Sequence, residues 1–206
     1  MANQHHGITG REVQSGIIPM QDSTTNTIGM ICFADDADPV IFPENIPVRV
    51  SSINRVLPAA GLTGNLRKCL EIISKITNPT LIVIRIPSPF GEVFDVHNVT
   101  GGVNEFGQRT GIEAFLTAKS ILGISPKIII APDVETPDVV EALAAVCKKL
   151  RAYSYVTPRD ITGGILPTAE EVVLYRDQLA HREIELIWPE WTSGSVFLGE
   201  IQPPQH

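Results

Sequence analysis

The sequence predicts an α/β fold, a mostly parallel sheet with helices on both faces. Short apolar, β-branched runs alternate with amphipathic segments that carry helix start and stop signals, an order typical of strands joined by crossover helices. The chain has 206 residues, of which 43% are hydrophobic and 19% charged, so it is long and apolar enough to bury one good-sized core. No internal repeat or low-complexity tract points to a solenoid or a linker instead.

Five apolar runs are the expected strands. The first, residues 28–34, stands alone in a β-rich segment and is followed by a Pro-rich loop over residues 35–47. The other four alternate with helices, and they are residues 80–86, 127–131, 152–157 and 183–188. Strands separated by helices imply parallel pairing through right-handed crossovers.

Cap residues and apolar periodicity predict the helices between these strands. The expected N-terminal caps are Thr63, Thr110, Thr136 and Thr168. Glu113 completes a capping box with Thr110, and that helix should end at Gly123. Pro137 suits the first position of the helix that follows Thr136.

The remaining segments complete the expected organisation. Residues 87–109 have glycine turns but no helical period, which favours a long irregular loop or a short hairpin. The predicted parts are an extended N-terminal arm (1–27), a β-rich N-terminal segment (28–61), a partial α/β domain (62–191) that contains the loop 87–109, and an irregular C-terminal tail (192–206).

Charge and cysteine content exclude several classes of partner. Lys and Arg number 16 against 23 Asp and Glu, a net charge of −7, which argues against binding to nucleic acid. No apolar run approaches the roughly 18 residues that membrane insertion needs. Three widely separated cysteines encode neither a disulfide framework nor a zinc site, so folding in a reducing, cytoplasmic compartment is the expectation.

One pair of acids could carry chemistry. Asp133 and Glu135 follow the strand 127–131, and ligands of α/β sheets bind at the carboxyl ends of strands. The alternative function is therefore a small soluble α/β enzyme with its site near these two residues. The favoured interpretation is structural, because acids just before a helix are stabilised by the helix dipole. Phosphate-binding glycine motifs and a nucleophile elbow are absent, so no catalytic residue, cofactor or metal is expected.

Aromatic residues gather at one place, Trp188-Pro189-Glu190-Trp191. Trp188 can belong to the core at the end of its strand. Trp191 lies beyond the proline and is the better candidate for a contact surface, since tryptophan offers a large area and one donor.

An ordered set of short segments resembles the tail sheath protein of contractile-tailed bacteriophages. The segments are His5-His6-Gly7, Gly29-Met30-Ile31-Cys32 with Asp36-Ala37-Asp38 and Phe42-Pro43, the run from Ala145 to Tyr153, Tyr175-Arg176, and Arg182-Glu183 before Ile187-Trp188-Pro189. No single segment is diagnostic, but the set runs in register from about His5 to Pro189.

The resemblance implies a non-enzymatic structural protein with a subtilisin-like domain. Such proteins stack as hexameric rings around the tail tube, attach to the baseplate, and contract to drive the tube through the host envelope for genome ejection. The expected location is the virion tail, after assembly in the host bacterial cytoplasm. The family's terminal arms add strands to a neighbour's sheet, and the matching residues here are Gly7, Ile8, Val13, Ser15, Ile17 and Ile18.

Sheath proteins are normally much longer than this chain. Their C-terminal region completes the α/β domain and forms the part that faces the tube. The sequence therefore resembles a C-terminally truncated form, whether a fragment, a truncated prophage product or a short relative. Such a form is expected not to assemble into sheath by itself.

Overall fold

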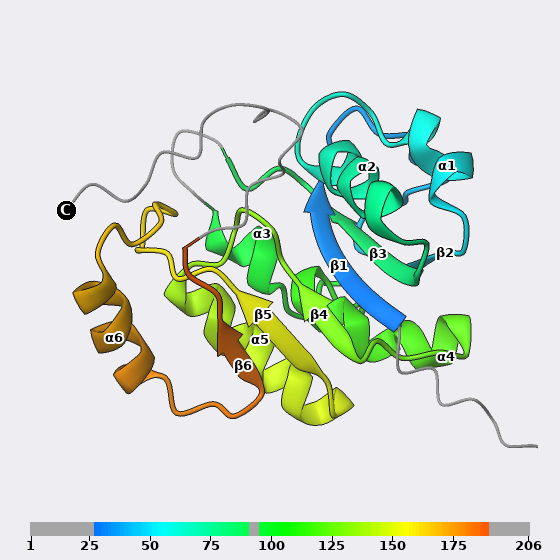
Figure 1. Cartoon of the computed structure of the whole chain (residues 1–206). Coiled ribbons are helices and arrows are strands. Elements are labelled where there is room, and N and C mark those ends of the chain that lie inside the picture. The colour runs from blue at the N-terminus through cyan, green and yellow to red at the C-terminus, as the bar shows by residue number, and fades with distance from the viewer. Residues whose placement is uncertain (1–26, 91–94, 190–206) are drawn as a thin grey trace, which may run out of the picture.

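The computed structural model describes residues 27–90 and 95–189 of the chain. They form a six-stranded sheet with helices on both faces, which confirms the predicted α/β class (Figure 1). The strands are β1 (Thr27–Phe33), β2 (Val48–Val50), β3 (Thr80–Ile86), β4 (Ile128–Ile130), β5 (Tyr153–Val156) and β6 (Ile184–Leu186). The helices are α1 (Ile53–Val56), α2 (Leu66–Ile76), α3 (Val96–Thr100), α4 (Ala118–Leu122), α5 (Pro137–Leu150) and α6 (Ala169–Gln178), with 3-10 helices η1 (Leu57–Ala59) and η2 (Gly111–Thr117).

The strand order is β2-β3-β1-β4-β5-β6. Every neighbouring pair is parallel except β2 with β3. β1 lies between β3 and β4, with Ile31 opposite Ile84 and Ile28 opposite Ile128. The predicted N-terminal segment 28–61 therefore shares one sheet with the residues that follow it, and it supplies β1, an interior strand of that sheet.

The neighbouring strands β1 and β3 alternate strictly between the two faces of the sheet. Met30 and Val83 point to the face that α2 covers, which we call the α2 face, and they pack there with Leu70. Ile31 and Ile84 point to the opposite face, the α5 face, which α3, η2 and α5 cover. Because both faces of β1 and β3 are covered, these strands read as continuous apolar runs.

Two of the helix predictions are confirmed at their N-termini. α5 begins at Pro137 after Thr136 in extended conformation, and its apolar stripe, with Leu143 as one member, is buried on the α5 face. At α6, the Thr168 hydroxyl accepts the N–H of Glu171, 3.3 Å away. No residue of α6 is fully buried, and the helix lies beside the first turns of α5.

The cap predicted at Thr63 is wrong. Asp36 takes the backbone N–H of Thr63 at 3.0 Å and also its hydroxyl, and the helix begins two residues later, after Asn65. The same carboxylate accepts the N–H of Leu62, and these bonds lower the pKa of Asp36 to about 2.

The capping box predicted at Thr110 is also wrong. The hydroxyl of Thr110 accepts from the N–H of Gly102, and Glu113 pairs with Arg109 at 2.7 Å instead of reaching the cap. The segment forms the 3-10 helix η2 and then the short α4, which ends at Gly123 as expected. In the loop 87–109, Val103 pairs with Arg109 as a hairpin would, and the helix α3 was not predicted.

Gly64 lets α2 start directly against the end of β1. Its φ is +75°, and an added Cβ would lie 2.1 Å from the carbonyl oxygen of Phe33. Gly123 has nearly the same φ, +74°, but open space around it. We expect Gly64→Ala to lower the free energy of unfolding by at least about 1 kcal/mol more than Gly123→Ala, because only the first adds a backbone clash to the left-handed strain. Urea unfolding of the two variants measures this, and equal losses would contradict it.

Candidate functional site

The carboxyl ends of β4 and β5 border an open cavity of about 340 Å³. Its lining includes Asp133 and Glu135 from the loop after β4, and Thr157 and Arg159 from the loop after β5. The structure thus brings both candidate acids to the edge where a parallel sheet places ligands. Arg159 was not among the candidates from the sequence.

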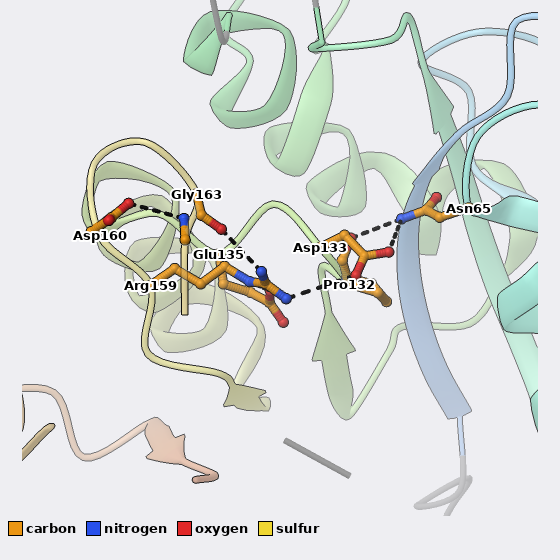
Figure 2. Close-up of polar contacts among 8 residues, drawn as sticks. Asn65, Pro132, Asp133, Glu135, Arg159, Asp160 and Gly163 are labelled. Atoms are coloured by element: carbon orange, nitrogen blue, oxygen red, sulfur yellow. Dashed lines mark hydrogen bonds and ion pairs between the residues drawn. The ribbon is translucent and has the colours of Figure 1, made fainter. Parts of the chain in front are cut away.

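Arg159 forms ion pairs with both acids. Its Nε lies 3.0 Å from a carboxylate oxygen of Glu135, and a terminal nitrogen lies 3.7 Å from Asp133 (Figure 2). A further guanidinium N–H donates to the carbonyl of Gly163 at 3.0 Å. Arg159 and Glu135 are only 8% and 6% exposed, so this ion pair is largely removed from water. We call Asp133, Glu135 and Arg159 the Arg159 cluster.

Burial dominates the electrostatics of Glu135. It raises the pKa of the carboxyl group to about 7, although Arg159 acts in the opposite direction through its charge and its hydrogen bond. Near pH 7, the cluster therefore has two protonation states, one with an ion pair of Glu135 and Arg159 and one with a neutral Glu135 carboxyl group beside the Arg159 cation.

Asn65 joins the cluster to the other side of the sheet. Its amide nitrogen donates to the carbonyl of Pro132 at 2.8 Å and reaches Asp133 at 3.5 Å (Figure 2). Its amide oxygen accepts the N–H of Phe33 at 3.1 Å. Asp133 itself has a φ of +69°. One buried amide thus ties the start of α2 to the ends of β1 and β4.

The contacts of the Arg159 cluster hold the loop after β4 to the loop after β5. A general acid or base must be free to exchange a proton with a substrate, whereas Glu135 is occupied by Arg159. Within residues 27–90 and 95–189, no three His, Cys, Asp or Glu side chains come together in a way that could hold a metal. The helix dipole predicted to explain the two acids is supplemented by a direct partner, Arg159, 24 residues from Glu135 in sequence.

A second buried arginine, Arg85, was also not identified from the sequence. Arg85 lies in β3 and is 4% exposed. Its guanidinium donates to the carbonyls of Phe42 at 2.6 Å and Ala34 at 3.1 Å, and pairs with Glu44 at 3.2 Å. The sequence carried a signal for it, because a lone arginine in the aliphatic run 80–86 needs a buried partner.

The comparisons with known proteins point to one family. No family model matches the chain. The tail sheath protein of Escherichia phage P2 is 34% identical to it over 197 residues, which cover 93% of this chain and 48% of the phage protein. The major tail sheath protein of Serratia phage KSP20 is 34% identical over 201 residues, covering 96% and 50%. Over nearly its whole length, the chain is therefore similar to about half of each of these two phage tail sheath proteins.

The chain spans about half the length of the curated relatives it matches. The match confirms the resemblance to tail sheath proteins found in the sequence. Among the described helices of the chain, none is both long and apolar enough to cross a lipid bilayer.

The candidate contact residues predicted from the sequence lie outside the described residues. They are Gly7, Ile8, Val13, Ser15, Ile17 and Ile18 of the predicted arm, and Trp191. Trp188 is described: it is 36% exposed, and its indole N–H donates to the carbonyl of Leu166 at 2.9 Å. That bond joins the end of β6 to the loop before α6.

Proposed function

We propose that the chain forms a structural part of a contractile tail sheath subunit. Such subunits polymerise as hexameric rings around the tail tube and contract to drive the tube through the host envelope. The partners would be other sheath subunits, the tube protein and the baseplate, with assembly in the host bacterial cytoplasm and a final place in the virion tail. The observation that carries the proposal is 34% identity to the sheath protein of phage P2 across 93% of this chain.

The buried polar contacts suit this role. Contraction of a lattice moves subunits largely as rigid bodies while flexible segments keep them connected. Asn65, Arg85 and Arg159 each tie loops at the carboxyl edge of the sheet to neighbouring elements, with buried hydrogen bonds. They would keep the sheet and its loops one rigid unit during such a movement.

The N-terminal residues would supply the connection between subunits. Val13, Ser15 and Ile17 alternate as a strand donated to another subunit requires, since main-chain hydrogen bonds give affinity and alternate side chains fix register. β6 is an edge of the described sheet and could receive such a strand. Trp191 follows β6 closely and would contribute to the same contact region.

A second candidate function rests on the cavity beside the Arg159 cluster. An enzyme with a site at Asp133 and Glu135 would be stabilised by its ligand. A thermal-shift screen with nucleotides and divalent metal ions tests this. We expect no change in Tm, and a reproducible increase that disappears in Glu135→Gln would favour the enzyme.

Electron microscopy of a chimera tests the sheath proposal. In this sheath chimera, the present chain replaces the aligned part of the phage P2 tail sheath protein. We expect striated tubes or rings from the chimera, and none from the isolated chain. A chimera that is folded by circular dichroism but stays monomeric at high concentration would contradict the proposal. Long striated tubes formed by the isolated chain would contradict the expectation that this chain does not assemble alone.

A further inference from the structure

Two of the three cysteines, far apart in sequence, meet between β1 and α2. Cys32 is the last but one residue of β1 and belongs to the cluster on the α2 face. Cys69 lies at the end of the first turn of α2, and it packs against the same cluster (Figure 1). The two thiols share a hydrogen bond. The third cysteine, Cys147, lies in α5, in the core on the opposite face.

Backbone hydrogen bonds hold the two cysteines in register. The N–H of Asn65 donates to the carbonyl of Phe33 at 3.0 Å, and the side-chain oxygen of Asn65 accepts the N–H of Phe33 at 3.1 Å. The N–H of Cys69 donates to the carbonyl of Asn65 at 2.9 Å, one helical turn further on. Since Phe33 directly follows Cys32, these bonds fix the helix position of Cys69 relative to the strand position of Cys32.

The two thiols differ in how easily a solute reaches them. Cys32 is 1% exposed, and burial raises its pKa, with further contributions from its contact with Cys69 and from the charge of Asp133. Cys32 is therefore a neutral thiol shielded from solution. Cys69 is only half-buried, so it is the member of the pair that a small molecule contacts first.

We propose that Cys32 and Cys69 form a modification site, at which a small-molecule disulfide oxidises the pair to an internal disulfide that links α2 to β1. The Cys69 thiolate attacks one sulfur of the small molecule, whose S–S bond breaks, and the other half leaves as a thiol with the proton that Cys69 lost. Cys32 then gives up its proton and attacks the Cys69 sulfur, and the second half leaves as a thiol with that proton. The two cysteines are oxidised, and one small disulfide is reduced to two thiols.

The proposed function determines when the bond would form, and this part of the inference rests on it. A reducing cytoplasm keeps the pair as thiols during assembly, whereas a virion tail outside the cell is in an oxidising environment. The disulfide would lie one helical turn from Asn65, which already ties the start of α2 to β1 and to the loop after β4. It would make this junction covalent in the released particle.

Incubation of the folded chain with glutathione disulfide, followed by mass spectrometry of its peptides, tests the site. We expect two peptides linked through Cys32 and Cys69, and a whole chain lighter by the mass of two hydrogen atoms. The Tm should rise by about 5 °C or more, because the link restricts the unfolded chain. Dithiothreitol should restore the original mass and Tm.

Cys147 provides the matched control, because it is fully buried, burial raises its pKa to about 12, and it lies on the other face of the sheet. Cys147→Ala should form the same internal disulfide as the unsubstituted chain. Cys32→Ala should stop at the mixed disulfide, with glutathione retained on Cys69. Cys69→Ala should take up no glutathione and show no rise in Tm. The peptides of the unsubstituted chain decide the question even where a variant fails to fold.

Three results would overturn the inference. The first is an unsubstituted chain that retains glutathione on Cys69, or does not react, and forms no internal disulfide. The second is a disulfide that forms only in urea or that includes Cys147. The third is a linked chain whose Tm is unchanged or lower, because the bond would then strain the contact between α2 and β1.

The outcome separates this inference from the proposed function. An internal disulfide in the chain, together with a folded sheath chimera that forms no assemblies, would refute the sheath proposal and leave the thiol pair intact. Tubes of the sheath chimera in which Cys32 and Cys69 stay free thiols after exposure to glutathione disulfide would do the reverse.

Discussion

Replacing Arg159 by methionine should destabilise the chain by about 3–5 kcal/mol at pH 8, the range for removing one partner of a buried ion pair. The substitution leaves Glu135 without its cation in a site only 6% exposed. It also removes the donor to the carbonyl of Gly163, which holds the loop after β5. Urea unfolding at constant ionic strength measures the loss.

The loss should depend on pH in one direction. The folded-state pKa of Glu135, about 7, lies above its ordinary value of 4.5, so its contribution to stability is fully present below pH 4.5 and is lost as the pH rises through 7. Without Arg159, that pKa rises further, since the guanidinium was lowering it. At pH 5, Glu135 is then neutral in both proteins, and only the lost hydrogen bonds remain, about 1–2 kcal/mol.

Arg176→Met is the matched control. Arg176 pairs with Asp177 on the surface, where the two side chains are 64% and 60% exposed, and its loss should cost no more than about 0.5 kcal/mol at either pH. A cost for Arg159→Met that is small, or that is larger at pH 5 than at pH 8, would contradict the buried ion pair.

Arg85→Met should have an effect of similar size, about 3 kcal/mol, because two buried carbonyl groups lose a charged donor. Arg85 donates to Phe42 and Ala34, on either side of the segment 35–41. The loss should therefore loosen that segment before the whole sheet unfolds. We expect faster limited proteolysis between residues 35 and 47, together with a lower urea midpoint.

Arg49→Met serves as the comparison, since Arg49 is an exposed residue of the neighbouring strand β2. It should change neither the urea midpoint nor the cleavage rate measurably. Unchanged proteolysis of the segment 35–47 in Arg85→Met would show that the arginine does not hold it.

Local signals in the sequence predicted the elements that depend on local chemistry. α5 was predicted well because Pro137 and a regular apolar stripe agree with each other. The helix expected after Thr110 was predicted less well. Thr110 bonds to Gly102 and Glu113 pairs with Arg109, so neither side chain takes part in the expected capping box. The central place of β1 depends on strand order, which a run of apolar residues does not encode.

In the candidate site too, the features that depend on local sequence could be predicted and the long-range contacts could not. Asp133 and Glu135 could be placed from the sequence, since residues after parallel strands collect at one edge of the sheet. Their partner could not, because Arg159 reaches Glu135 across 24 residues and no local pattern links the two. The sequence therefore located the site, while the structure showed that its charges are paired.

Cryo-electron microscopy of the sheath chimera tests the central claim most directly, that this chain is a working part of a tail sheath subunit. We expect regular tubes whose subunit density accommodates the sheet in the order β2-β3-β1-β4-β5-β6, with β1 in its centre. A folded chimera without regular assemblies, or tubes whose subunit density excludes this sheet, would contradict the claim.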